Sequence, residues 1–380
     1  MGVNHYLIRT LVFFSCLLVF AAVHSQTGVS LQEEDLQFQN LFDPDVKQGV
    51  ACYRIPALVT AADGSLIIAI DERNETCGDL RYNKDINIVV RRSSDNGLSW
   101  SEIENIVDYP YGISASDPSM VMDRETGDIF LFYNYMDLEK ENGIYYQHMI
   151  RSKDNGKTWS AAVDITPQIT RPEWQEAFKI ITSGGGTQTR SGQLLHIIFL
   201  VGQGACVFGS DDHGQSWHLF GEMFHPADES KIVELDDGSW MVNSRVNGAG
   251  LRYVHISHDE GKTWTTRPDS SLIDPGCNAA LINYNAAGSN RVEGLLLFTN
   301  ASSIDKRENM TLKISNDNGL SWTGDVLIYP GSAAYSSMSI LENGDIGLVF
   351  EKDDYRENVF VRIPRGKILP HRDHSSLPHE

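Results

Sequence analysis

The chain has 380 residues, of which 41% are hydrophobic and 22% charged, so its composition excludes a disordered protein and supplies enough apolar residues for one large core or two ordinary ones. Its 51 acidic and 31 basic residues leave a formal charge of -20, which argues against binding to nucleic acid. The 32 glycines and 13 prolines suit a turn-rich all-β chain better than a helical bundle.

Residues 1–25 are predicted to form a secretory signal peptide. Arg9 supplies its positive charge, 11–23 its apolar stretch, and 23–25 a small-residue cleavage pattern. An uncleaved N-terminal anchor is the alternative. No later stretch approaches the ~20 apolar residues that a membrane-spanning helix needs. We therefore expect the mature chain in the secretory pathway, in the lysosomal lumen or outside the cell.

The cysteines and glycosylation motifs agree with an oxidising compartment. Removal of the signal peptide leaves an even number of cysteines, Cys52, Cys77, Cys206 and Cys277, and four cysteines allow three pairings. Three acceptor motifs for N-linked glycans begin at Asn74, Asn300 and Asn309. We therefore expect a disulfide-bonded glycoprotein.

One octapeptide of the pattern Ser-x-Asp-x-Gly-x-Ser/Thr-Trp occurs five times, at 93–100, 152–159, 210–217, 257–264 and 315–322. Its Asp can accept bonds from backbone N–H groups ahead of it, its Gly supplies a positive φ, and its Trp anchors the loop. Each copy follows a strand-like run, such as 87–90. The copies are therefore predicted to be structural turns between strands, Asp-box turns, whose aspartates have no catalytic role.

The spacing of the repeat indicates the architecture. Its tryptophans lie 59, 58, 47 and 58 residues apart. A period near 58 fits a four-stranded blade, and about 355 mature residues divided by six give about 59. We predict a six-bladed β-propeller over 26–370 and a polar tail at 371–380. A β-sandwich with decorated hairpins is the alternative, and it does not explain so regular a spacing.

The repeats together with Tyr53-Arg54-Ile55-Pro56 resemble the exo-α-sialidases, or neuraminidases. The segments 228–230 to 244–245 and 329–331 to 335–337 are most similar to the lysosomal-type animal sialidases. The resemblance implies a retaining exo-α-sialidase that removes terminal α-linked sialic acids from glycoproteins, glycolipids or oligosaccharides, without metal or cofactor. Lysosomal relatives can require a carboxypeptidase partner, which makes such a protective partner a candidate for this chain.

Three arginines match the family's triad by position: Arg54, Arg245 and Arg307. A sialic acid carries a carboxylate on its anomeric carbon, and planar guanidinium groups hold a carboxylate better than lysine does. Like charges in one pocket repel, so an acidic neighbour is expected to offset the repulsion. Glu351 matches the family glutamate that braces the first arginine.

The resemblance assigns the nucleophile to Tyr335 and its base to Glu229. A carboxylate nucleophile would meet repulsion from the substrate's own carboxylate, and sialidases are the tyrosine exception among glycosidases. Because a tyrosine ordinarily titrates near pH ~10, it needs both the base and nearby arginine charge.

Asp79, in the loop 77–81, best matches the family's acid/base, which protonates the leaving oxygen and later activates water. Asp71 and Asp85 are the competing carboxylates. The loop contains glycine and could close over the substrate. Cys52 and Cys77 precede Arg54 and Asp79 by two residues each, so convergence of those two residues would bring a Cys52–Cys77 disulfide near the site.

Two further residues are assigned to sugar specificity by the resemblance. Arg73 resembles an outer arginine that faces the ring hydroxyls, and Asp117 matches a position that accepts from the N-acetyl amide. A glycan on Asn74, directly beside Arg73, would crowd this site, so Asn309 is the glycan acceptor that we expect to be used.

Two alternative functions remain open at this stage. A sialic-acid-binding propeller without turnover would keep the arginines and lose Tyr335, Glu229 or Asp79, all of which are present. Transfer of sialic acid to another sugar, or its intramolecular release as an anhydro product, would use the same residues as hydrolysis. No His/Cys cluster has metal-ligand spacing, and the mechanism requires no metal.

Overall fold

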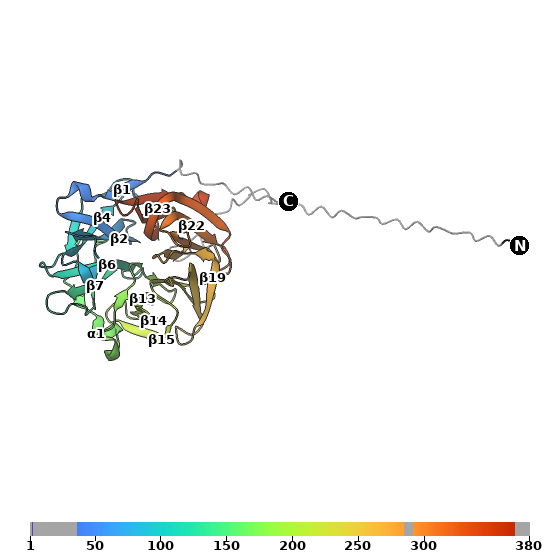
Figure 1. Ribbon diagram of the computed structural model, residues 1–380, viewed down its shortest axis with the longest axis horizontal. Coiled ribbons are helices and arrows are strands. Elements are labelled where there is room, and N and C mark those ends of the chain that lie inside the picture. The colour runs from blue at the N-terminus through green and yellow to red at the C-terminus, as the bar shows by residue number, and fades with distance from the viewer. Residues whose placement is uncertain (1, 3–35, 285–291, 369–380) are drawn as a thin grey trace. The chain divides into compact units, whose positions relative to one another are not determined.

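The computed structural model describes Gly2 and residues 36–284 and 292–368. The predicted signal peptide, 1–25, and the predicted polar tail, 371–380, therefore lie outside the described residues. Residues 31–380 form one compact unit. Its regular structure is almost entirely β, as composition predicted, and Figure 1 shows the sheets following one another in chain order around a common centre, from blue through green and orange to red.

Four of the five sheets hold four or five strands each. The first is β2-β3-β4-β5, with β2 (Val50–Thr60), β3 (Leu66–Asn74), β4 (Ile86–Ser93) and β5 (Glu104–Val107). The second is β11-β6-β7-β8-β9, with β6 (Ile113–Met122), β7 (Ile129–Asp137), β8 (Tyr146–Ser152), β9 (Val163–Asp164) and β11 (Gly184–Gly185). The third is β10-β13-β14-β15, with β10 (Lys179–Ile181), β13 (Leu194–Leu200), β14 (Gly204–Ser210), β15 (His218–Phe224) and, paired to β13, β12 (Thr187–Gln188). The fourth is β16-β17-β18-β19, with β16 (Ser230–Glu234), β17 (Trp240–Ser244), β18 (Leu251–Ser257) and β19 (Thr265–Ile273).

The fifth sheet has seven strands and closes the ring. Its order is β1-β25-β24-β23-β22-β21-β20, with β1 (Gln39–Phe42), β20 (Ala280–Asn283), β21 (Leu296–Ala301), β22 (Glu308–Ser315), β23 (Gly324–Ile340), β24 (Ile346–Lys352) and β25 (Glu357–Ile363). The first half of β23, 324–332, pairs with β22, and its second half, 333–340, pairs with β24. Strand β1 pairs antiparallel with β25, so the start of the described unit completes the sheet made by its end.

Among the described residues, helical structure is limited to short turns before or after strands. They are α1 (Thr166–Ile169) and the 3-10 turns η2 (Pro44–Val46), η3 (Leu80–Tyr82), η4 (Pro172–Trp174) and η6 (Arg365–Lys367). Within the described part of the chain, no helix is long and apolar enough to cross a membrane.

All five copies of the octapeptide form the same hydrogen-bonded turn. In the first copy, the amide of Gly97 donates to Ser93 Oγ at 2.9 Å, and the amide of Ser99 donates to Asp95 Oδ1 at 2.9 Å. Gly97 has a φ of 81°, a conformation that favours glycine. The other four copies repeat these two bonds at 2.8–2.9 Å.

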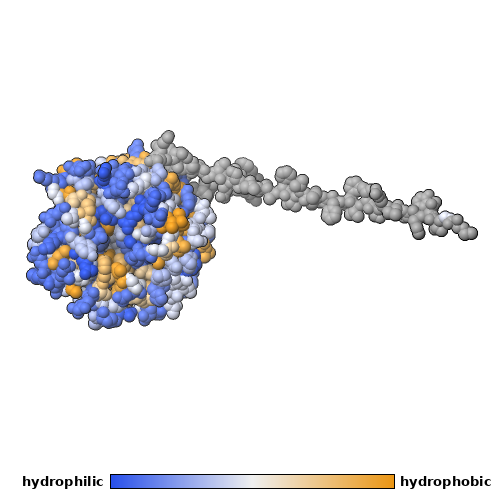
Figure 2. All heavy atoms as spheres, in the orientation of Figure 1, coloured by the Kyte–Doolittle hydropathy of each residue, from blue (hydrophilic) through white to orange (hydrophobic). Residues whose placement is uncertain are grey.

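The tryptophans of the repeat and the hydrophobic clusters join neighbouring sheets. Trp100, which follows β4, packs edge-on against Phe360 of β25, with ring centroids 5.0 Å apart. One buried cluster likewise combines Val89 of the first sheet with Val349 and Phe360 of the last. The core is therefore distributed between the sheets, and Figure 2 shows a largely hydrophilic surface with smaller hydrophobic areas on the face in view.

Candidate active site

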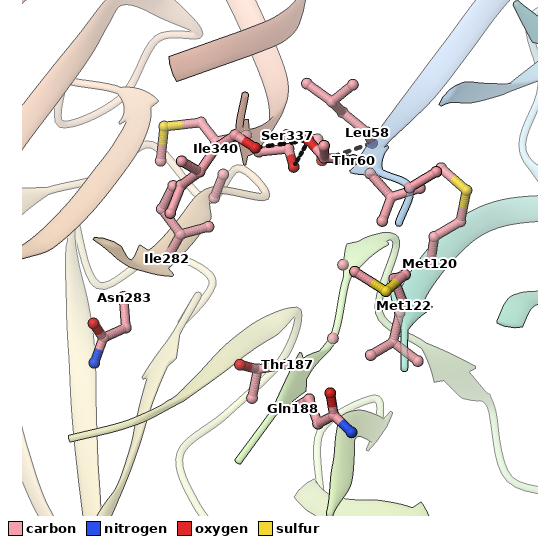
Figure 3. A pocket seen from close by; sticks show the side chains of 18 of the residues that line it. Leu58, Thr60, Met120, Met122, Thr187, Gln188, Ile282, Asn283, Ser337 and Ile340 are labelled. Carbon is pink, nitrogen blue, oxygen red and sulfur yellow. Dashed lines mark hydrogen bonds between the residues drawn. The ribbon is translucent and has the colours of Figure 1, made fainter. Parts of the chain in front are cut away.

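The predicted site residues gather at one end of the strands that surround the centre of the ring. On β2, Arg54 precedes the residues 58–60, and on β23, Tyr335 precedes 337–340. The later residues of both strands line a pocket of about 500 Å³, together with residues of β6, β16 and β20. Figure 3 shows this pocket between Met120, Ile282 and Ile340. None of the predicted site residues lines it, so the pocket and the site lie toward opposite ends of the inner strands.

Glu351 of β24 binds the side chain of Arg54 and the backbone of Tyr335 at the same time. Arg54 donates to it from Nε at 2.7 Å and from Nη2 at 3.4 Å. The amides of Ile55 and Tyr335 also donate to its two oxygens, at 2.9 and 3.1 Å. Glu351 is fully buried, and although burial lowers the pKa of Arg54, the carboxylate more than compensates and the pKa ends above its usual value. The structure thus places Glu351 where a brace for Arg54 was predicted.

The side chain of Tyr335 is hydrogen-bonded to those of Glu229 and Arg245. The hydroxyl of Tyr335 donates to Glu229 Oε2 at 2.8 Å. Arg245 Nη1 donates to the same carboxylate oxygen at 2.5 Å and to the Tyr335 hydroxyl at 3.2 Å. Burial and the charge of Glu229 raise the pKa of Tyr335 well above its usual value, against the opposing charges of Arg245 and Arg307. The phenol is therefore protonated, and its proton already points at a carboxylate that can take it.

The other two arginines flank the ring of Tyr335. The guanidinium carbon of Arg54 lies 5.7 Å from the ring centroid, and that of Arg307 lies 5.4 Å from it. Arg307 precedes β22, and it donates to the hydroxyl of Tyr355 at 3.1 Å and to the carbonyl of Gly276 at 3.3 Å. Three guanidinium groups from distant parts of the chain thus converge on one tyrosine, as the predicted triad requires.

Asp79 lies on an exposed loop that two contacts attach to the site. Its side chain is 77% exposed and accepts from Arg73 Nη1 at 2.7 Å. Arg73 also donates to the carbonyl of Cys77 at 3.0 Å, and Cys77 forms the expected disulfide with Cys52. Burial alone would raise the pKa of Asp79, but Arg73, with Arg54 and Arg307 further away, lowers it. The carboxylate is therefore ionised while Arg73 holds it.

Arg73 itself is almost fully buried, which differs from the open position suggested for an arginine facing sugar hydroxyls. Its side chain is 1% exposed. Nε and Nη2 donate to Asp71 at 3.2 and 3.0 Å, and Nη1 donates to Asp79. In this structure Arg73 donates to two carboxylates, Asp71 and Asp79.

Of the two competing carboxylates, Asp71 is enclosed and Asp85 is half-buried. Asp71 accepts from Arg73, from the hydroxyl of Ser116 at 2.6 Å and from the amide of Asp117 at 2.9 Å. Burial raises the pKa of Asp71 to about 6, although those donors oppose the shift. The contacts of Asp71 leave it no freedom to approach a leaving group, whereas the exposed Asp79 has that freedom.

Asp117 adjoins this cluster at a bulge in β6. It has a φ of 60° and lies where the pairing of β6 with β7 is interrupted. Burial and the negative charge of Asp71 raise its pKa well above the usual value, a shift that favours the protonated form. Its Oδ2 accepts from Asn134 Nδ2 at 3.3 Å. A neutral carboxylic acid can both accept and donate, as an amide ligand requires.

Sequence reasoning missed Tyr355 at the site and Lys231, a buried lysine that lines the pocket at the opposite end of the inner strands. Tyr355 stacks on Arg54, with 3.9 Å between the guanidinium carbon and the ring centroid. Lys231 of β16 is buried and donates to the carbonyl of Ser183 at 2.5 Å and to Asn278 Oδ1 at 2.9 Å. Burial lowers the pKa of Lys231 to about 7. Neither residue belongs to a repeat or motif, so the sequence carried no signal for them beyond the two-residue spacing of Lys231 from Glu229.

Known proteins resemble this chain over most of its length. Residues 77–348 match the family described as BNR repeat-like domain. The chain is 35% identical over 337 residues to a sialidase of Micromonospora viridifaciens, which covers 80% of this chain and 50% of that protein. It is 26% identical over 378 residues to Sialidase-2 of Cricetulus griseus, over 88% of this chain and 97% of that one. Among solved structures, Hadza microbial sialidase Hz136 has a TM-score of 0.76 at 27% identity, over 88% of this chain and 69% of that one. This chain thus spans half the length of its Micromonospora relative.

Proposed function

Because this chain belongs to the sialidase family, within the BNR repeat-like proteins, we propose that it is a retaining exo-α-sialidase. Its substrates in this proposal are the terminal α-linked sialic acids of glycoproteins, glycolipids and oligosaccharides. The observation that carries the proposal is the convergence of Arg54, Arg245 and Arg307 on Tyr335. Three permanent positive charges beside a protonated phenol suit an anion whose carboxylate adjoins the reacting carbon.

The proposed reaction has two displacements. The arginines bind the substrate carboxylate, and the oxygen of Tyr335 attacks the anomeric carbon while its proton passes to Glu229. Asp79 protonates the leaving sugar oxygen, which breaks the glycosidic bond and leaves a covalent sialyl-tyrosine. In the second step Asp79 accepts a proton from water, the water oxygen attacks the same carbon, and Tyr335 recovers its proton from Glu229. Two inversions give net retention.

The acid step requires a movement of Asp79. A general acid must be protonated, whereas the contact with Arg73 lowers the pKa of Asp79. We propose that the loop carries Asp79 away from Arg73 and toward the glycosidic oxygen when substrate binds. Its 77% exposure and its place between β3 and η3 support this movement, and the enclosed Asp71 lacks such freedom.

We further propose that the ring consists of six blades and that the protein works in the secretory pathway. The division of β23 between two groups of strands supports six blades in five hydrogen-bonded sheets. The Cys52–Cys77 disulfide supports an oxidising compartment. Asn300 is buried and donates to the carbonyl of Ile273 at 2.8 Å, so Asn74 and Asn309 are the glycan acceptors that fit the folded chain.

The proposed function is tested by turnover of a fluorogenic sialoside with the wild-type protein and Tyr335→Phe. We expect the wild type to release the fluorophore and Tyr335→Phe to be slower by a factor on the order of 10³ or more, because the nucleophile is lost. Tyr284→Phe is the matched control, since Tyr284 donates to the carbonyl of Gly344, on the turn after β23.

Product analysis by NMR separates hydrolysis from transfer. With sialyllactose as substrate, we expect free sialic acid of retained anomeric configuration, with or without added lactose. Equal rates for the wild type and Tyr335→Phe would remove the proposed nucleophile, and an anhydro or newly sialylated product would replace hydrolysis by transfer.

A further inference from the structure

The turn between β24 and β25 has an unusual backbone. Asp353, Asp354 and Tyr355 have φ values of 50°, 54° and 68°. Residues other than glycine visit this left-handed region uncommonly, and usually as single residues. Such conformations persist where the surrounding structure determines them, and they gather at functional sites. Three in succession therefore point to a reason for holding this turn in place.

The turn is attached to the strand that carries the nucleophile. The amide of Asp353 donates to the carbonyl of Ser332 at 2.9 Å, and the hydroxyl of Ser332 donates to Asp354 Oδ1 at 2.8 Å. The amide of Asp354 donates back to Ser332 Oγ at 3.2 Å. Because Ser332 lies on β23 three residues before Tyr335, these bonds couple the position of the turn to that of the nucleophile.

The turn places the side chain of Tyr355 at the site. Its ring covers the guanidinium of Arg54 at 3.9 Å and packs against the buried group of Ile55, Cys277, Ala334 and Tyr335. Its hydroxyl accepts from Arg307 Nη1 at 3.1 Å. Tyr355 therefore bridges two of the three arginines that would hold the substrate's carboxylate.

The hydroxyl of Tyr355 still has a hydrogen to donate. A phenol can accept and donate at once, and Arg307 uses only its accepting capacity. Among residues 36–284 and 292–368, no group accepts a hydrogen bond from this hydroxyl. Since the two arginines beside it can only donate, an anion between them would meet the hydroxyl as a further donor.

We propose that Tyr355 is a substrate-binding residue: its hydroxyl is a fourth donor to the carboxylate of the sialic acid, and its ring holds the Arg54 guanidinium in position. This inference rests on the proposed sialidase function and adds a contact to it. The contact exists in the ground state and in the transition state alike, so its loss should raise KM and leave kcat nearly unchanged.

The test compares the wild type with Tyr355→Phe, which keeps the ring over Arg54 and removes only the hydroxyl. Two probes are titrated by calorimetry or ligand-observed NMR: the unsaturated glycal of N-acetylneuraminic acid, and the same glycal with its carboxylate replaced by a hydroxymethyl group. Because a hydrogen bond to a charged group is lost, we expect binding of the acid to weaken roughly 10- to 100-fold. Binding of the alcohol should change by less than about twofold, since the hydroxyl acts on the carboxylate.

Tyr284→Phe serves again as the control for loss of a tyrosine hydroxyl, and thermal unfolding of each variant verifies that it is folded. Equal weakening of both probes by Tyr355→Phe would show a merely structural role and overturn the inference, as would unchanged affinity for the acid. A wild-type protein that binds neither probe would overturn the proposed function and this inference with it. That result differs from one in which the wild type binds the acid and Tyr355→Phe binds it equally well.

Discussion

At the scale of single residues, Glu351 holds several parts of the site together. It receives the side chain of Arg54 and the amides of Ile55 and Tyr335. Ile55 has a φ of 66°, which is strained for a β-branched residue. One buried carboxylate therefore balances a buried charge, fixes a strained backbone and positions the strand that carries Tyr335, the proposed nucleophile.

Glu351→Gln is expected to lower the free energy of unfolding by about 3–5 kcal/mol, because Arg54 would lose its buried counter-charge. The glutamine side chain would also place its own N–H donors beside the N–H donors that Glu351 now accepts from. Affinity for a sialoside should fall as well. Urea unfolding and ligand titration measure the two effects. Glu357→Gln, which weakens a more exposed pair with Lys352, is the control and should cost less than about 1 kcal/mol. A similar loss in both variants would contradict this role for Glu351.

At the scale of elements, the loop between β3 and η3 combines a fixed base with an exposed tip. Cys77 is bonded to Cys52, two residues before Arg54, and Arg73 contacts both the Cys77 carbonyl and Asp79. The amide of Gly78 donates to Thr76 Oγ1 at 3.1 Å. The disulfide therefore limits how far the loop can travel while its tip remains accessible.

Reduction of the Cys52–Cys77 bond is expected to increase amide exchange over 75–79 and to lower kcat by roughly 10- to 100-fold, because Asp79, the proposed acid, would be positioned less accurately. Cys77 is exposed, so a soluble phosphine can reach the bond. The double variant Cys52→Ser/Cys77→Ser should already show both effects and should not respond to the reductant. Unchanged exchange and turnover after verified reduction would remove this role of the disulfide.

At the scale of the whole molecule, the site exists only because the ring closes. Arg54 lies on the first sheet, Glu229 adjoins the fourth, and Tyr335 lies on the fifth, which β1 and β25 complete. Burial between sheets also affects stability. His196 of β13 is 1% exposed and packs edge-on against Phe132 of the second sheet, and burial, followed by the charge of Lys231, lowers its pKa to about 3.

This histidine predicts a loss of stability in acid. Below the ordinary histidine pKa of about 6.5, His196 binds a proton in the unfolded chain, whereas in the folded chain it binds one only near pH 3. The free energy of unfolding therefore falls as the pH drops through this window. In His196→Phe the fall between pH 6 and pH 4 should be smaller by up to about 1.4 kcal/mol per pH unit.

Urea unfolding across that range measures the slope. Phe220→Leu, which removes a non-titrating ring from β15 of the same sheet, is the control and should keep the wild-type slope. Identical slopes for His196→Phe and the wild type would contradict a neutral His196 in the folded state.

The sequence by itself determined those structural features whose hydrogen bonds join residues close together in the chain. The turn of the octapeptide is made by its own Ser, Asp and Gly, so five copies could be predicted as turns without knowing their surroundings. The positions of the arginines and of Tyr335 came from resemblance to a family, because residues as far apart as Arg54 and Glu351 carry no local sign of contact.

Tertiary structure alone decided the enclosure of Asp71, the burial of Arg73 and Asn300, and the placement of Tyr355 over Arg54. Asp71, Asn300 and Tyr355 each contact residues of another sheet, namely Ser116, Ile273 and Arg54. The burial and the electrostatic environment of these residues depend on contributions from the whole fold. They therefore cannot be predicted from any single stretch of sequence.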